Sequence, residues 1–331
     1  MARRMAEFFV GQVAAVRPFG TGHINETFLV ESAAGEYVIQ RINTAVFADP
    51  EAVTANIVVV HRHVRRELMP EPVPTTAGKW LAWDGVDPWR AWWRVPGRPL
   101  GSAEASPAAL RAAGDLLGRF HGLVADLDPA ALTETLPGFH DPGRRLAALR
   151  EVIDADPCGR VATVPDEIEM AQEAQSLVET AAEITRRVPR RVAHFDAKLD
   201  NILFDGDDVV ALVDFDTVMP GAWVWDVGDL LRSGATTAAE DEPDTDRVVV
   251  AQERYQAIVD GYRESLVRTG VSVRDELEAV DAAGAIVTYE QAVRFLTDWI
   301  AGDVYYRISR PTQNLDRARA QFRLLASMPR S

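Results

Sequence analysis

The sequence predicts a mixed α+β fold built of two lobes, a β-rich N-terminal lobe and a larger, mainly helical C-terminal lobe. The chain has 331 residues, more than the roughly 150 of one typical domain. Segments with strand character gather before residue 95, and segments with helical periodicity dominate after it. The turn Pro96-Gly97-Arg98-Pro99 separates the two patterns, so we expect lobes over residues 1–95 and 96–331.

The N-terminal lobe is expected to open as an antiparallel sheet and to contain one helix. Segments with strand character cover residues 7–17, 26–31, 36–42 and 80–95. A helix is expected over 49–68, because Asp49 can cap its first turn and Pro50 suits the first helical position. Valine and isoleucine recur at helical spacing along this segment, which predicts that one face of the helix is buried.

The C-terminal lobe is expected to be mainly helical, with a short β region inside it. Apolar residues recur at helical spacing along several segments that are long enough for helices. These segments cover residues 106–124, 165–188, 245–268, 275–300 and 311–328. A β region is expected over 192–215, with a turn at Asp205-Gly206-Asp207-Asp208.

Composition and charge restrict the partners and the location of the protein. The 35 lysines and arginines and 50 acidic residues give a net charge of −15, which disfavours binding to nucleic acid or to anionic membranes. Cys158 is the single cysteine, so an intrachain disulfide and a cysteine-based zinc site are excluded. No apolar run has the length of a signal peptide or of a membrane span. We therefore expect a cytoplasmic protein that acts on a small molecule.

One segment carries the residue pattern of phosphoryl transfer. The sequence His194-Phe-Asp196-Ala-Lys-Leu-Asp-Asn201 fits the pattern His-x-Asp-x-x-x-x-Asn of kinase catalytic loops. In that pattern the aspartate, here Asp196, accepts the proton of the attacking hydroxyl, and the asparagine, here Asn201, holds magnesium. The hairpin that follows returns Asp214 beside Asn201, and their oxygens suit Mg²⁺. The alternative interpretation is that these residues only shape turns.

Lys198 lies two residues after Asp196, where its ammonium group could meet the transferring phosphoryl group. The chain has only two lysines, Lys79 and Lys198, against 33 arginines. A lysine retained inside the catalytic loop is therefore expected to be functional. The alternative is a solvated surface lysine.

A glycine-containing segment near the N-terminus could cover the phosphates of a nucleotide. Gly20-Thr-Gly22-His-Ile-Asn25 lies between two expected strands and resembles a Gly-x-Gly-x-x-Gly loop with asparagine in the third position. A strand follows it, which disfavours a dinucleotide-binding fold and leaves a plain hairpin turn as the alternative. The lysine of the kinase strand is missing, and alternation lets only one of Gln40 and Arg41 face the phosphates. Charge favours Arg41, and alignment with the kinase strand favours Gln40.

With these motifs the sequence resembles the aminoglycoside phosphotransferase and choline kinase superfamily, and within it most closely the N-acetylhexosamine 1-kinase-like phosphotransferases. The likeness extends over nearly the whole chain. Besides the catalytic loop, it rests on residues 22–27, 40–43, 136–141, 214–221, 226–229 with Arg232, and 294–298 with Gly302-Asp303. The resemblance implies a bilobal, protein-kinase-like fold that uses ATP and Mg²⁺. It also implies transfer of the γ-phosphate to a sugar hydroxyl, most closely the anomeric hydroxyl of an N-acetylhexosamine.

Carried over residue by residue, the resemblance makes Asp196 the catalytic base and makes Asn201 and Asp214 the metal ligands, with Asp216 in the same metal-site motif. Phe195 departs from the asparagine that often follows the histidine in this family. The candidates for nucleotide binding are Gly20, Gly22, Gln40 and Arg41. The candidates for substrate binding are His23, Asp226, Arg232, Arg294 and Tyr305.

Several of the substrate candidates also have a structural interpretation. Asp226 and Arg232 could belong to a buried network that ties the catalytic loop to a helix. Arg294 and Asp298 could form a surface ion pair, because they are four residues apart on an expected helix. Aromatic residues such as Tyr305 near Arg294 favour a sugar site, which needs aromatic faces beside hydrogen-bond donors.

Two other functions remain open at this point. An aminoglycoside or amino-alcohol kinase binds cationic substrates, which would suit an acidic chain. A pseudokinase-like binding module would account for the missing strand lysine, although Asp196, Asn201 and Asp214 are all intact.

Overall fold

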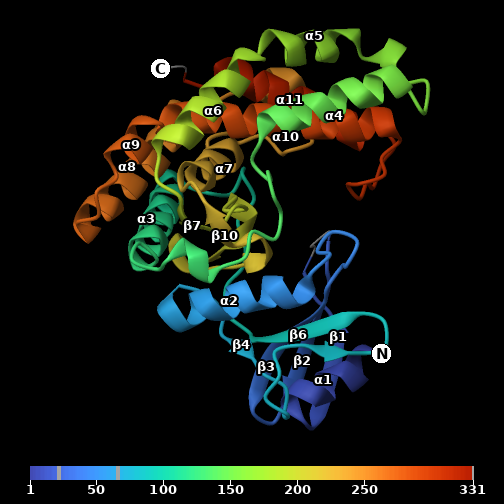
Figure 1. The fold of residues 1–331 in the computed structure, drawn as a ribbon, viewed down its shortest axis with the longest axis vertical. Helices are drawn as coiled ribbons and strands as arrows, with labels where there is room; N and C mark the ends of the chain where they lie inside the picture. Colours follow the sequence, from blue (N-terminus) through green and yellow to red (C-terminus); the bar gives the residue numbers. More distant parts are fainter. Residues whose placement is uncertain (21–23, 65–67, 330–331) are drawn as a thin grey trace.

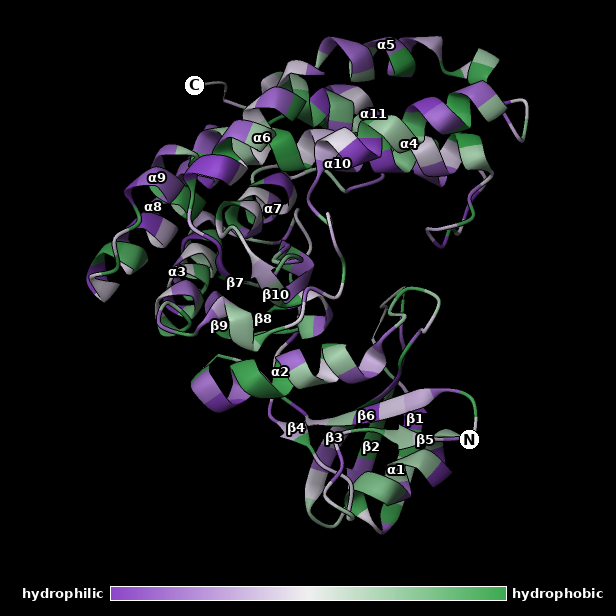
Figure 2. Cartoon of the chain, viewed as in Figure 1, coloured by the Kyte–Doolittle hydropathy of each residue, from purple (hydrophilic) through white to green (hydrophobic). Residues whose placement is uncertain are grey.

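The computed structural model describes residues 1–20, 24–64 and 68–329. It has an N-terminal sheet of antiparallel strands and a larger helical part, as the sequence predicts (Figure 1). Gly22 and His23, two of the candidate site residues, lie outside the described residues. Hydrophobic and hydrophilic residues alternate along the helices (Figure 2). Among the helices of the described residues, none combines the length and the apolar character that crossing a membrane requires.

The N-terminal sheet has six strands, in the order β1-β2-β3-β6-β4, with β5 paired to β6. The strands are β1 (Val13–Pro18), β2 (Glu26–Ser32), β3 (Gly35–Arg41), β4 (Pro72–Val73), β5 (Ala82–Trp83) and β6 (Pro88–Trp93). Two register pairs matter for the site. Gln40 of β3 lies opposite Thr27 of β2 on one side and opposite Arg90 of β6 on the other.

The first strand was predicted to begin at residue 7, and this is wrong. The helix α1 (Ala2–Val10) occupies that position and ends at Gly11, which adopts a φ of 68°. Met5, Ala6 and Phe9 are the buried residues of α1, and their spacing is helical. The expected strand began inside this helix because the apolar run continues across Gly11 into β1.

Helix α2 (Pro50–Val64) packs between the sheet and the helical part (Figure 1). Asp49 caps it, since its carboxylate accepts a hydrogen bond from the Ala52 N–H at 2.9 Å. Asn56 ties α2 to the helical part: its Nδ2 donates to the carbonyls of Thr133 at 2.7 Å and Val218 at 3.0 Å.

Two hydrophobic cores stabilise the molecule. The smaller one lies between α1 and the sheet and includes Phe9, Ile39 and Trp89. The larger one contains the buried face of α2, with Val53 and Ile57, together with the cores of the C-terminal helices. The larger core therefore crosses the lobe boundary expected at residues 95 and 96.

The helical part contains nine α-helices and two two-stranded ladders among the described residues. The helices are α3 (Pro107–Leu123), α4 (Pro142–Ala155), α5 (Pro165–Glu173), α6 (Ser176–Arg187), α7 (Val224–Gly234), α8 (Gln252–Thr269), α9 (Arg274–Glu278), α10 (Val280–Ala301) and α11 (Gln313–Ser327). In the ladders, β7 (Arg191–Ala193) pairs with β10 (Met219–Gly221), and β8 (Ile202–Asp205) pairs with β9 (Asp208–Leu212).

The expected helices differ from the observed ones in three ways. The segment 165–188 is two helices, α5 and α6, and 275–300 is divided between α9 and α10. The segment expected over 245–268 is helical as α8 only from Gln252. Helices α4 and α7 were not predicted. Nearly every residue of α7 is buried, including its polar residues Asp226, Asp229 and Arg232, which recur at helical spacing on one face.

Candidate active site

Two residues, one at the start of the catalytic loop and one after the hairpin that follows it, have an uncommon backbone conformation. Phe195 and, after the hairpin, Asp214 both have a φ of 65°, in the left-handed region that non-glycine residues rarely adopt. The ring of Phe195 lies against Gly221 of β10, where a Cβ atom would overlap the ring. Glycine at 221 therefore provides the space for Phe195 and for the loop geometry that follows it.

Asp226 of α7 holds the start of the loop. Its fully buried carboxylate accepts hydrogen bonds from the N–H groups of His194 at 2.8 Å and Phe195 at 2.6 Å. It also accepts from Nε2 of His121 at 2.9 Å. Burial acts to raise the pKa of Asp226, but the hydrogen bond and charge of His121 outweigh it and the pKa falls below its ordinary value. The placement matches the structural interpretation of Asp226, since its carboxylate has no exposed surface.

Asp196 lies at the centre of the loop with two side chains fixed against it. Lys198 Nζ is 2.8 Å from Oδ1 and 2.7 Å from Oδ2 of Asp196. Asn201 Nδ2 donates to Oδ2 of Asp196 at 2.8 Å and to its carbonyl at 2.7 Å. Burial acts to lower the pKa of Lys198, but the charges of Asp196, Asp229 and Asp214 outweigh it, so the pKa is raised. Lys198 is thus an ammonium group bound to an oriented carboxylate.

Asp214, which follows the hairpin, is close enough to Asp196 and Lys198 to interact with their charges, and its pKa is strongly shifted. Burial, followed by the charges of Asp216 and Asp196, raises the pKa of Asp214 to about 7. Because Asn201 donates through Nδ2, its Oδ1 is the atom left for a cation. The carboxylate of Asp214 and the amide oxygen of Asn201 are hard oxygen ligands, which Mg²⁺ prefers.

The protein ligands alone form an incomplete metal site. Within the described part of the chain, no three His, Cys, Asp or Glu side chains converge closely enough to hold an ion. Mg²⁺ needs only one or two protein carboxylates, because phosphate and water oxygens complete its octahedron. The residues present therefore fit a magnesium ion that binds together with a nucleotide.

Asp216 connects the loop to the N-terminal sheet. One of its carboxylate oxygens accepts a hydrogen bond from Asn25 Nδ2 at 2.6 Å, and the other forms a short ion pair with Nη1 of Arg90. The side chains of Arg90 and Asp216 are each 3% exposed. Asn25 is held in turn by the N–H of Asn43, which donates to its Oδ1 at 3.0 Å.

The structure places Gln40 and Arg41 on opposite faces of β3. Gln40 points toward Arg90, and its Oε1 accepts hydrogen bonds from that guanidinium. Arg41 pairs with Glu26 and with Asp87, and lines a cavity of about 380 Å³ that Asn25 and Arg307 also line. Gly20, with a φ of 75°, ends the described part of the glycine loop.

Arg294 of α10 lies among aromatic rings. Its guanidinium carbon is 5.5 Å from the ring centre of Phe139, 5.6 Å from that of Tyr306 and 6.0 Å from that of Tyr305. Asp298 is not its ion-pair partner in the structure. Instead Asp298 accepts hydrogen bonds from the N–H groups of residues 304–306 and thereby fixes the segment that carries the two tyrosines.

The rings of Phe139, Tyr305 and Tyr306 around Arg294 form an aromatic site. A buried pair, His140 and Glu290, lies next to it, with the ring of His140 against that of Phe139. His140 donates through Nδ1 to the carboxylate of Glu290 at 2.9 Å and through Nε2 to the carbonyl of Phe195 at 3.0 Å. Since Phe195 precedes Asp196, this contact links the aromatic site to the catalytic loop. Burial acts to lower the pKa of His140, but the negative charge of Glu290 outweighs it and raises the pKa.

Arg232 lies in a second buried network. Its guanidinium is 2.7 Å from Asp229 and 2.9 Å from Glu240, and its side chain is 4% exposed. It lines a small polar cavity of about 60 Å³ together with Leu199 and Asp200 of the catalytic loop. This placement again matches the structural interpretation.

Arg90, Glu290 and the pairing of Asn25 with Asp216 were not predicted from the sequence. Arg90 carries a weak signal, since it is a single charge within the apolar segment Trp89-Arg-Ala-Trp-Trp93. Charges in such segments are buried only when they are paired. Its partner, however, is 126 positions along the chain and could be located only from the structure.

Comparison with known proteins identifies the family and confirms the fold. The family model described as the phosphotransferase enzyme family (APH) matches residues 15–264. Among solved structures, a microcompartment-associated aminopropanol kinase is 14% identical with a TM-score of 0.66, covering 97% of this chain and 94% of that one. The GDP complex of aminoglycoside 2'-phosphotransferase-IIIa is 14% identical with a TM-score of 0.61, covering 94% and 93%. A Plasmodium vivax ethanolamine kinase is 12% identical with a TM-score of 0.59, covering 93% and 81%.

Proposed function

The chain belongs to the phosphotransferase enzyme family, and we propose that it is an ATP- and magnesium-dependent kinase whose acceptor is a neutral sugar. The most specific form of this proposal is phosphorylation of the anomeric hydroxyl of an N-acetylhexosamine. The observation that carries it is the position of Arg294 within the aromatic site beside the catalytic loop.

The catalytic loop supports transfer to a hydroxyl group. Asp196 takes the proton of the acceptor hydroxyl while the acceptor oxygen bonds to the γ-phosphorus and the bond from that phosphorus to the oxygen of ADP breaks. Lys198 pairs with Asp196 and brings a positive charge beside the transferring group. Asn201, Asp214 and Asp216 would hold Mg²⁺, which neutralises phosphate charge when it is bound.

The aromatic site argues for a neutral acceptor. Enclosures of aromatic rings bind quaternary ammonium and other cationic groups through cation–π attraction. In this protein the guanidinium of Arg294 already lies over Phe139, Tyr305 and Tyr306. A cationic amine would meet a like charge there, whereas a sugar would find hydrogen-bond donors beside aromatic faces.

Two segments that resemble the hexosamine 1-kinases meet at this site. Phe139 belongs to the segment 136–141, and Arg294 begins the segment 294–298. They are far apart in the sequence, yet the guanidinium of Arg294 lies over the ring of Phe139. Their meeting beside the catalytic loop supports a role for both in binding the acceptor.

A second candidate is an aminoglycoside or amino-alcohol kinase. The acidic net charge of −15 favours it, and the similar structures include an aminoglycoside phosphotransferase and kinases of aminopropanol and ethanolamine. The charge of Arg294 and Lys198 around the acceptor position opposes it, because local charges act on a bound ligand more strongly than net charge does.

A substrate panel tests these candidates. ADP formation is measured with N-acetylhexosamines, hexoses, aminoglycosides, choline and ethanolamine, and the Asp196→Asn variant serves as the blank. We expect turnover with an N-acetylhexosamine and phosphorus coupling to carbon 1 in the NMR spectrum of the product. Turnover only with amines would establish the second candidate, coupling at carbon 6 would refute the anomeric assignment, and ATP binding without turnover of any acceptor would favour the pseudokinase-like module.

A further inference from the structure

The cation that a kinase strand supplies to the phosphates has to come from another residue in this chain. Kinases of this fold place a lysine on the third strand, where it binds the α- and β-phosphates. The two lysines here are Lys198, which is bound to Asp196, and Lys79, which lies in a turn between β4 and β5. The missing charge must therefore be supplied by an arginine or be absent.

The six strands of the N-terminal sheet carry three arginines, and they differ sharply in placement. Arg17 pairs with Glu31 and its side chain is 63% exposed, and Arg41 pairs with Glu26 and Asp87 and is 37% exposed. Arg90 is 3% exposed and reaches the acidic motif of the catalytic region through Asp216. Of the three, Arg90 is the cation that faces the metal-binding residues.

Gln40 holds the Arg90 guanidinium in a fixed orientation. Oε1 of Gln40 accepts hydrogen bonds from Nε of Arg90 at 3.0 Å, from Nη2 at 2.8 Å and from Nε1 of Trp92 at 3.0 Å. The guanidinium also lies over the ring of Trp92, with its carbon 5.2 Å from the ring centre. Gln40 is neutral, so it orients Arg90 without cancelling its charge.

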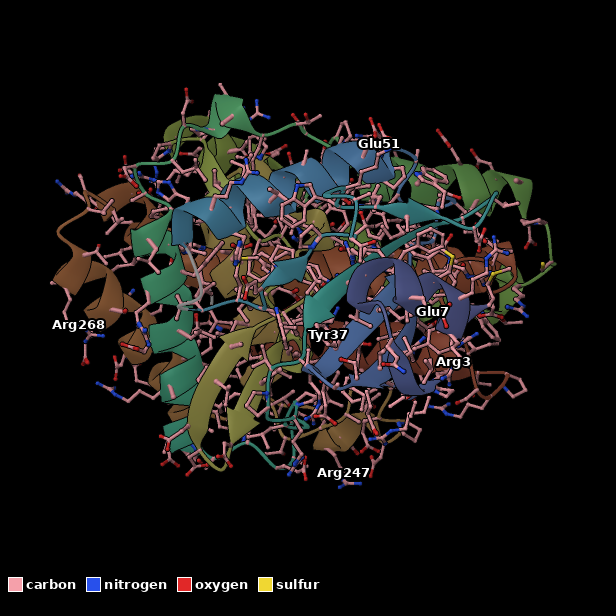
Figure 3. The ribbon with its side chains drawn as sticks, turned by 90° about the horizontal axis from the view of Figure 1, so that it is seen from below. Arg3, Glu7, Tyr37, Glu51, Arg247 and Arg268 are labelled. Atoms are coloured by element: carbon pink, nitrogen blue, oxygen red, sulfur yellow. The ribbon has the colours of Figure 1, made fainter. Side chains whose placement is uncertain are left out.

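Helix α2 supplies no acid to neutralise Arg90. In kinases the strand lysine pairs with a glutamate of the corresponding helix. The single acidic residue of α2 is Glu51, which is exposed in its first turn and lies at the edge of the molecule (Figure 3). Among the described residues, the acidic partner of Arg90 is therefore Asp216 of the metal-site motif, not a residue of α2.

The Arg90 contact with Asp216 leaves hydrogen-bonding capacity unused. Nη1 and Nη2 of Arg90 carry two N–H groups each. Among the described residues each nitrogen has one partner, Asp216 for Nη1 and Gln40 for Nη2, so one N–H on each is left for another acceptor. A buried donor of this kind is costly unless a partner satisfies it. An arginine fork matches two phosphate oxygens, which would supply that partner.

We propose that Arg90 of β6, oriented by Gln40 of β3, is the cation that binds the phosphates of the nucleotide, in place of a lysine on β3. This inference rests on the proposed function, because it takes the ligand to be a nucleoside triphosphate. Gln40 is on this basis a positioning residue, whereas Arg41 lies on the opposite face of β3 and is paired with Glu26 and Asp87.

The test compares ligands with and without phosphates. Affinities for ATP with Mg²⁺ and for adenosine are measured for the wild type, Arg90→Gln, Arg90→Lys and the control Arg94→Gln, by calorimetry for ATP and by ligand-observed NMR for adenosine. Arg94 directly follows the same strand, and its ion-pair partner among the described residues is Glu36. We expect Arg90→Gln to weaken ATP binding at least tenfold, Arg90→Lys to weaken it less, and adenosine affinity to change less than twofold in all variants.

A second variant separates charge from packing. Gln40→Glu keeps an oxygen acceptor for Arg90 but places a second carboxylate beside the guanidinium, in addition to that of Asp216. We therefore expect it to weaken ATP binding while the melting temperature is maintained. Equal losses for ATP and adenosine in Arg90→Gln, or unchanged ATP affinity in Gln40→Glu, would show that Arg90 is only structural. If the wild type binds neither ATP nor GTP, the proposed function itself is refuted. If the wild type binds ATP and Arg90→Gln binds it equally well, this inference alone is refuted.

Discussion

Replacement of Asp226 by asparagine is expected to destabilise the protein and to slow the chemical step. The carboxylate of Asp226 serves three donors, the N–H groups of His194 and Phe195 and the ring of His121. Asparagine offers one oxygen, so at least one buried N–H would face an NH₂ group. A lost hydrogen bond to a charged group and an unsatisfied buried donor together cost about 3 kcal/mol.

The loss is large enough to measure in two ways. For a chain of this size, about 3 kcal/mol lowers Tm by roughly 5–10 °C. The two N–H groups directly precede Asp196, so we also expect kcat to fall roughly tenfold or more while the KM for ATP stays within about threefold. Differential scanning calorimetry and steady-state kinetics give the two values.

Asp126→Asn is the matched control, because Asp126 is exposed and its partner is His63 at the surface. Its Tm is expected to change by roughly 1–2 °C at most, since exposed ion pairs contribute little. A wild-type Tm and kcat in Asp226→Asn would refute the positioning role. An increase confined to the KM for the acceptor would instead restore Asp226 as a substrate residue.

Five further variants test the site. Asp196→Asn should bind nucleotide normally but lose about 10²-fold or more in kcat, and a kcat near that of the wild type would remove Asp196 as the base. Asp214→Ala should abolish the magnesium dependence of nucleotide binding, measured by calorimetry with and without Mg²⁺. Gln40→Ala should raise the KM for ATP more than Arg41→Ala does, and the reverse order would favour the charge of Arg41. Arg294→Ala should raise the KM for the sugar about tenfold with little change for ATP, and equal effects on both would contradict a role in acceptor binding.

The residues that follow local rules were predictable from the sequence. The spacing from Asp196 to Asn201 defines the catalytic loop, and a short hairpin necessarily returns Asp214 to it. The cap at Asp49 and the helix after it also depend on neighbours in the sequence. These features are set by a few consecutive residues, which is why the expectation and the structure agree on them.

Features that depend on contacts between distant strands were not predictable. Alternation along β3 left Gln40 and Arg41 equivalent until the pairing of β3 with β6 placed Gln40 opposite Arg90. Helix α7 was not predicted although its polar residues share one face. That face is buried, and Asp226 gains its partners from His121 and the start of the catalytic loop, which are distant in the sequence. The segment before Gly11 was misread because a short apolar run fits either a strand or a helix.

The attachment of α2 changes which parts of this molecule can move against each other. Asn56 and the apolar face of α2 fasten the helix to the C-terminal part, while α1 and the sheet share a core of their own. The sheet with α1, and the C-terminal part with α2, are the two bodies that an opening of the molecule would separate, although α2 precedes residue 95. Any opening would slide the sheet over α2 and carry Arg90 and Asn25 away from Asp216, so the acidic motif would be exposed to solvent and to incoming nucleotide in a single movement.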